Sequence, residues 1–150
     1  AYYATYFTVR ADEFDADIVV GGEARVRKTR EAIKQKGNDA TQKEKNLDTI
    51  LELVLEAMLR GIRFARVDIY RSHPHRFLII GDKQLLPPLA SLQGMGENAA
   101  NSLTAAREEG SFLSIEDLKT RGRISSAVIE VLQKHGCLEG MSETDQLALF

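Results

Sequence analysis

The clearest hydrophobic pattern in the chain lies between residues 43 and 60, where apolar side chains recur every three or four positions. This spacing places them on one face of a helix, and Gly61 follows as a stop signal. The apolar face consists of Leu47, Ile50, Leu51, Val54 and Met58. A second, more charged helix is predicted from Glu23 to Lys36, ending at Gly37. The first part of the chain should therefore be mainly helical.

The pattern changes after Gly61. The segments from Arg66 to Arg71 and from Arg76 to Ile80 have the Val, Ile, Tyr and Phe content of strands. Residues 72–75 contain a proline and would join the two strands, and Pro87-Pro88 would close the unit. We therefore predict a small β unit after the helices.

Two closely spaced glycines follow this unit, within Leu92-Gln93-Gly94-Met95-Gly96-Glu97-Asn98-Ala99-Ala100. The run resembles the helix-hairpin-helix DNA-binding motif, in which glycines let the backbone turn sharply and approach a ligand closely. The helix that follows would offer its first N–H groups and the positive end of its dipole to a phosphate oxygen. Glu97 is less favourable, because its negative charge suits the helix dipole but opposes a phosphate. The alternative is an ordinary helix-turn-helix with a glycine at its C-cap.

A second and looser hairpin is predicted between Ser114 and Gly136. Ser114 is a suitable N-cap for a short helix through Lys119, and a helix from Ser126 to His135 would follow a turn around Gly122. The alternative is a solvated basic turn. The two hairpins together supply the candidate DNA-binding residues Gly94, Met95, Gly96, Asn98, Arg107, Arg121, Gly122, Arg123 and Ser125. We expect Met95 to be a plug between two helices, and paired hairpins to hold one phosphate strand each across a minor groove.

The last five residues, 146–150, are apolar apart from the first and follow an acidic stretch. This peptide resembles the pentapeptide by which bacterial replication and repair proteins bind the ring-shaped sliding clamp. The match gives Gln146, Leu147, Leu149 and Phe150 as candidate clamp-binding residues. In that family the glutamine amide forms hydrogen bonds while the leucine and phenylalanine side chains fill an apolar pocket. The alternative is a last strand or half-turn of the chain's own domain.

Composition sets limits on these interpretations. The 150 residues are 43% hydrophobic and carry a net charge of −2, so no bulk positive charge favours nucleic acid. Positive charge is concentrated in residues 23–45, which could bind phosphate or form a solvated helix face. The single cysteine, Cys137, fits a reducing cytosol, and no apolar run is long enough to span a membrane. We expect a cytoplasmic protein.

Taken together, the sequence resembles the C-terminal region of the PolC-type DNA polymerase III alpha subunit, the replicative polymerase of low-GC Gram-positive bacteria. The residues that carry the resemblance are Tyr2 to Arg10, Asp68 to Ser72, the first hairpin, Ala106 to Ser114, Glu116-Asp117-Leu118, Arg121-Gly122, Gly136-Cys137-Leu138 and the terminal peptide. The chain has no initiator methionine and begins inside an aromatic segment, so we expect a fragment of a larger protein.

The resemblance implies an α+β, mainly helical fold with a small β unit, paired helix-hairpin-helix motifs and a flexible C-terminal tail. Residues 1–88 would be the end of a fingers-like region, residues 89–138 a duplex-binding domain, and residues 139–150 the clamp-binding tail. The partners would be duplex primer-template DNA and the sliding clamp, and the clamp-loader tau subunit is left open. The polymerase activity, its two magnesium ions and a 3′–5′ exonuclease would lie in the parent protein, outside this chain, which would hold no catalytic residue or cofactor.

Two other functions are compatible with parts of the sequence. A helix-hairpin-helix DNA glycosylase carries an aspartate about twenty residues after the hairpin, a spacing that Asp117 approaches. However, Asn98 stands where the bifunctional enzymes have a lysine, and the usual sequence around the aspartate is missing. A DNA-binding adaptor of repair or competence would need the tandem hairpins but not the fingers-like residues 1–88.

Overall fold

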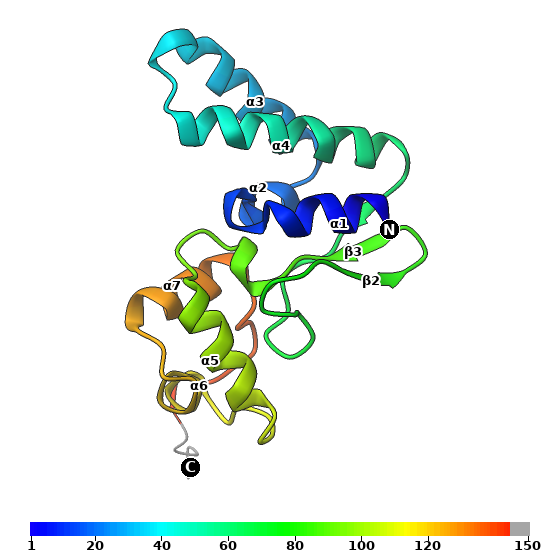
Figure 1. The fold of residues 1–150 in the computed structure, drawn as a ribbon. Helices are drawn as coiled ribbons and strands as arrows, with labels where there is room; N and C mark the ends of the chain where they lie inside the picture. The colour runs from blue at the N-terminus through cyan, green and yellow to red at the C-terminus, as the bar shows by residue number, and fades with distance from the viewer. Residues whose placement is uncertain (145–150) are drawn as a thin grey trace.

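The computed structural model describes residues 1–144, and the candidate clamp-binding residues Gln146, Leu147, Leu149 and Phe150 lie outside the described residues. The described part is mainly helical with one small three-stranded sheet, as predicted. Figure 1 shows α3 and α4 at one end, α1, α2 and the sheet in the middle, and α5 to α7 at the other end. No helix within residues 1–144 is both long and apolar enough to cross a membrane.

The two helices predicted in the first part of the chain are confirmed. This part contains α1 (Tyr2–Val9), the 3-10 helix η1 (Ala11–Glu13), α2 (Ala16–Val20), α3 (Glu23–Lys36), η2 (Gly37–Asp39) and α4 (Gln42–Leu59). A reciprocal cap begins α4, because Thr41 Oγ1 accepts the Glu44 N–H while the Glu44 carboxylate accepts the Thr41 N–H. Helices α3 and α4 pack as an antiparallel pair, with an ion pair of 2.8 Å between Arg30 and Asp48.

The predicted strand pair is only partly correct. The sheet consists of β1 (Arg63–Phe64), β2 (Leu78–Gly81) and β3 (Gln84–Leu86) in the order β1-β3-β2. Strand β3 is antiparallel to β2 and parallel to β1. The second predicted strand therefore overlaps β2, but its main partner is β3, which the sequence pattern did not predict.

Residues 66–71 form no strand because polar side chains take the backbone N–H groups that a strand would use. The Asp68 carboxylate accepts the N–H groups of Tyr70 and Arg71, at 2.8 and 3.2 Å. Ser72 Oγ accepts the Asp68 N–H at 2.9 Å. Such local hydrogen bonds stabilise a turn at the expense of a strand. The segment therefore turns back toward β2.

The C-terminal part holds the two predicted hairpins. Its elements are the 3-10 helix η3 (Leu89–Ser91), α5 (Glu97–Arg107), α6 (Ile115–Gly122) and α7 (Ser126–His135). The first helix of the first hairpin is therefore a single 3-10 turn, whereas the second hairpin has two α-helices.

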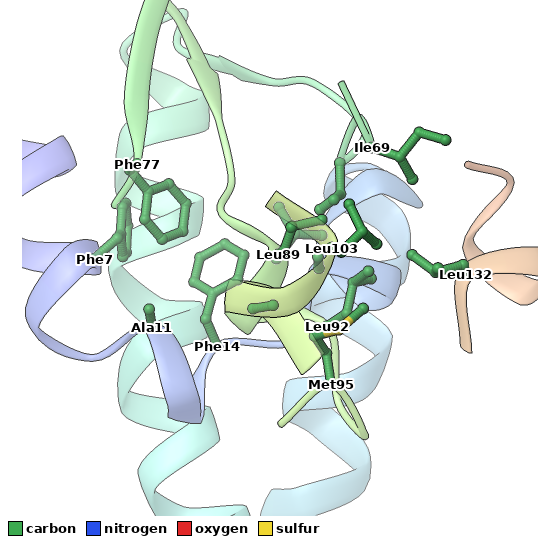
Figure 2. Packing of buried hydrophobic residues seen from close by; sticks show 14 of the residues in the cluster. Phe7, Ala11, Phe14, Ile69, Phe77, Leu89, Leu92, Met95, Leu103 and Leu132 are labelled. Carbon is green, nitrogen blue, oxygen red and sulfur yellow. The ribbon is translucent and has the colours of Figure 1, made fainter. Parts of the chain in front are cut away.

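One hydrophobic cluster runs through both parts of the chain. At one end Phe7, Phe14 and Phe77 pack with ring centroids 4.8 to 5.6 Å apart. Figure 2 shows Phe14 beside Leu89, with Leu92 and Met95 of the first hairpin further along, and the same cluster continues to α7. The predicted division between residues 88 and 89 thus crosses a continuous core, and its assignment as a domain boundary stays a prediction.

A buried histidine joins three segments of this core. The imidazole of His135, which is 3% exposed, lies with Nδ1 2.6 Å from Asp17 Oδ1, and its Nε2 accepts the Val67 N–H at 2.9 Å. Because Nε2 accepts a hydrogen bond, the arrangement fits a neutral ring that donates from Nδ1 to Asp17. Burial lowers the pKa of His135, and Asp17 opposes this shift only in part. Helix α7 is therefore tied to α2 and to the segment after β1.

This arrangement predicts that the fold loses stability in mild acid. A histidine pKa lowered by folding leaves stability intact above the ordinary value of 6.5 and reduces it as the pH falls through that value. Chemical denaturation between about pH 7.5 and about pH 5.5 should show this fall in the free energy of unfolding.

The matched control is His135→Gln, which cannot titrate. This variant should lose roughly 1–3 kcal/mol at neutral pH because buried partners lose hydrogen bonds, and its stability should depend less on pH than that of the wild type. An equal pH dependence in both proteins would contradict the assignment.

Candidate nucleic-acid interface

The first hairpin depends on two glycines with different surroundings. Gly94 has φ +95°, and a Cβ there would lie 2.9 Å from Val131 Cγ2 of α7. Both the backbone conformation and this close contact require glycine. The hairpin is thereby packed directly against α7.

Gly96, in contrast, is not required by the chain's own packing. Its φ of −72° is open to any residue, and a Cβ there would meet nothing within 4 Å. Gly96 is also the N-cap of α5, and no side chain in residues 1–144 caps this helix. The first N–H groups of α5 therefore lack the side-chain acceptor that a Ser or Asp at this position would supply.

The other predicted residues of this hairpin divide into buried and exposed groups. Met95 is 6% exposed and lies in the core, consistent with a plug, so its side chain faces away from solvent. Asn98 and Glu97 are exposed on the first turn of α5. The Arg107 guanidinium donates to the Ile69 carbonyl at 3.1 Å, and burial lowers its pKa. Arg107 thus connects α5 to the segment after β1.

The second hairpin forms a different turn from the one predicted. Gly122 is buried as the last residue of α6, and the left-handed conformation falls on Arg123, with φ 52° and ψ 46°. Ser125 is the N-cap of α7 and accepts the Val128 N–H at 3.2 Å. The turn therefore depends on a non-glycine residue in a conformation that costs about 1–2 kcal/mol.

Two basic side chains face solvent at this turn. Arg123 is exposed, and within residues 1–144 its guanidinium has no hydrogen bond or ion pair. Lys119, which the sequence analysis did not select, reaches across the hairpin and donates to Ser126 Oγ at 2.7 Å. The seven-residue spacing of Lys119 and Ser126 across the turn is the sequence feature that could have indicated this contact.

Arg121 belongs to the interior of the hairpin region. Its guanidinium donates to three backbone carbonyls and to Asp117, all at 3.0 Å, and lies 4.7 Å from the Phe112 ring centroid. The three carbonyls are those of Ala106, Gly110 and Ser111. Arg121 therefore holds the connection between α5 and α6, and a phosphate would have to compete with these bonds.

Asp117, the residue considered for a glycosylase, is also engaged locally. Its carboxylate accepts the Leu113 N–H at 2.9 Å and the Arg121 guanidinium at 3.0 Å, and these bonds lower its pKa. No group of three His, Cys, Asp or Glu side chains within the described chain is placed to hold a metal ion.

Comparison with known proteins identifies the family of the chain. The family described as helix-hairpin-helix motif matches residues 61–147. The chain is 54% identical over 150 residues to the PolC-type DNA polymerase III of Caldanaerobacter subterraneus subsp. tengcongensis, covering 100% of the chain and 11% of that protein. It is 52% identical over 149 residues to that of Bacillus subtilis, covering 99% of the chain and 10% of that protein.

The chain thus spans about a tenth of the length of these relatives. The family match covers more than half of the chain and includes both hairpins. The chain belongs to the helix-hairpin-helix motif family and, over its whole length, corresponds to a region of PolC-type DNA polymerase III at about 50% identity.

Proposed function

We propose that this chain binds duplex DNA through its two hairpins, without sequence preference, as part of a replicative polymerase. The observation that carries the proposal is the start of α5 at Gly96, which no side chain of residues 1–144 caps and where an added Cβ would meet open space. A phosphate oxygen is the ligand that such a site fits best. Because phosphate contacts carry no base information, this binding mode suits an enzyme that must copy any sequence.

The second hairpin complements the first with charge. Lys119 and Arg123 project at a turn where Ser125 already caps one amide of α7. The first hairpin would therefore bind phosphate with backbone N–H groups, and the second with cationic side chains. The left-handed Arg123 supports this role, since backbone strain is often retained at functional positions.

We further propose that the terminal peptide, residues 146–150, binds the sliding clamp. The support is its sequence, together with the position of the chain just before it. The carbonyls of Ser142 and Glu143 accept the N–H groups of Ile115 and Glu116, at 2.8 and 2.9 Å. Residues 142 and 143 therefore lie at the start of α6, while the turn of the second hairpin lies at the other end of this helix. Eight residues of helix separate these points by about 12 Å.

Such an arrangement would join two weak contacts in one chain. Burial of three apolar side chains contributes roughly 1.5–3 kcal/mol each before the entropic cost of ordering the peptide. This contribution is compatible with a micromolar Kd for the complex of the peptide and the clamp. Once the hairpins hold the duplex that passes through the clamp, the second contact becomes intramolecular. Polymerisation itself would belong to the whole parent protein and its two metal ions.

Replacement of Gly96 tests the first hairpin directly. Gly96→Ser should stabilise the chain slightly, by a few tenths of a kcal/mol, because serine caps α5. The same hydroxyl would occupy the N–H group meant for phosphate, so duplex affinity should fall for all sequences alike. Thermal melting and fluorescence anisotropy with two unrelated duplexes measure the two effects.

The matched variant is Gly94→Ala, which should lose about 1–3 kcal/mol of stability because of its positive φ and the contact with Val131. Unchanged DNA affinity in Gly96→Ser would contradict the proposed phosphate site.

Substitutions at Arg123 and Arg121 should change the stability of the fold in opposite directions. Arg123→Gly should stabilise the fold by up to about 1 kcal/mol by relieving the left-handed conformation, yet reduce the slope of log affinity against log salt by about one. Arg121→Lys keeps the charge but loses the planar fork, so it should cost about 1–3 kcal/mol of stability. Chemical denaturation measures the stability of each variant, and salt titration of DNA binding measures the slope. A higher stability of Arg121→Lys than of Arg123→Gly would contradict the roles assigned to the two residues.

Removal of residues 146–150 should abolish binding to purified sliding clamp in calorimetry and leave duplex binding unchanged. A chain that keeps its length but carries Gln146→Ala and Phe150→Ala is the control for nonspecific effects of truncation, and it should fail in the same way. Full clamp binding by the truncated chain would exclude the peptide as the contact.

A further inference from the structure

The loop formed by residues 71–76 packs against the first hairpin, although it comes before the hairpin's glycine-containing turn in the sequence. Its backbone carbonyls at His73 and Pro74 accept the N–H groups of Leu89 and Ala90, at 3.0 and 3.1 Å. These two acceptor residues therefore hold η3, the first turn of the first hairpin. The 71–76 loop is fixed relative to the glycines that follow η3.

A side-chain contact fixes the same loop to the second helix of the hairpin. His75 Nε2 lies 2.7 Å from Asn101 Oδ1 on α5. His75 also lines a hollow of about 390 Å³ together with Gly94 and Glu97 of the hairpin. The loop thus contacts both helical elements of the first hairpin and borders its mouth.

The loop carries positive charge that has no counter-charge in contact with it. Arg71 and Arg76 are exposed, and within residues 1–144 neither guanidinium forms an ion pair. Arg76 Nε lies 3.3 Å from His73 Nε2, but His73 Nδ1 already accepts two backbone N–H groups. A neutral imidazole has one acceptor nitrogen, so this contact leaves the Arg76 guanidinium largely unpaired.

The electrostatic surroundings of His73 also indicate an excess of positive charge at the 71–76 loop. Burial lowers the pKa of His73, and Arg76, His75 and Arg107 lower it further through their positive charge. Among the carboxylates of this region, Glu97 and Asp12 line the adjacent hollow, and Asp68 is engaged by backbone N–H groups. The 71–76 loop is therefore a local concentration of positive charge on a nearly neutral chain.

We propose that the 71–76 loop is a third phosphate-binding segment, in which Arg76 contacts the same DNA strand as the first hairpin. The inference rests on the proposed duplex binding and extends it from the two hairpins to the loop that precedes them. Asn101 lies five residues after Gly96, which is about 7.5 Å along α5.

The charge-removing variant Arg76→Gln tests the loop in the 150-residue chain. Its slope of log affinity against log salt should be smaller than that of the wild type by about one, equally for two unrelated duplexes. The matched control is Arg60→Gln, which removes the same charge from the exposed C-terminal end of α4 and should leave the slope unchanged. Arg76→Lys keeps the charge and should keep the slope, and melting curves establish that each variant folds.

The outcomes separate the loop from the hairpins. If Gly96→Ser weakens DNA binding but Arg76→Gln binds with the wild-type slope, the loop proposal is wrong and the hairpin proposal stands. If the wild-type chain does not bind duplex DNA, the proposed function fails and the loop proposal with it. If Arg76→Gln impairs binding of a poly-glutamate peptide but not of DNA, the loop is a site for an acidic protein, which also overturns the proposal.

Discussion

The position of the hairpins depends on the buried imidazole of His135. Its two nitrogens link α7 to the partly exposed Asp17 of α2 and to the buried backbone of Val67. Helix α7 in turn presents Val131 to Gly94, where no side chain larger than hydrogen fits without adjustment. A chain of close contacts therefore runs from the N-terminal helices to the first hairpin. Because buried polar groups are costly to leave unpaired, this link should resist relative movement of the two parts.

A chain with a net charge of −2 can still bind a polyanion if its few relevant charges and dipoles are placed well. The first hairpin offers backbone N–H groups at Gly96, and the second offers Lys119 and Arg123. Arg121 and Arg107, in contrast, donate to backbone carbonyls inside the fold. The number of basic residues is therefore a poor guide to the proposed interface, because some of them have structural roles.

The sequence was most informative where structure follows from local periodicity and capping. The bounds predicted for α3 were confirmed, and those for α4 differ by one residue at each end, because their apolar stripes and flanking glycines are local signals. The strand predicted at residues 66–71 was wrong, because side chains such as Asp68 compete for the backbone. The turn predicted around Gly122 begins after this residue, because α6 includes Gly122, and the left-handed conformation lies at Arg123. The internal role of Arg121 depends on carbonyls up to fifteen residues away, which no spacing rule indicates.

In the proposed interface the first hairpin binds phosphate through backbone N–H groups, and the second through the side chains of Lys119 and Arg123. The most direct measurement is the change in amide chemical shifts when a short duplex is added to the isotopically labelled chain. The largest shifts are expected at residues 97–99, with smaller shifts at residues 75, 76, 119 and 123. Shifts concentrated on the basic helix α3 instead, with the hairpin amides unmoved, would contradict this interface.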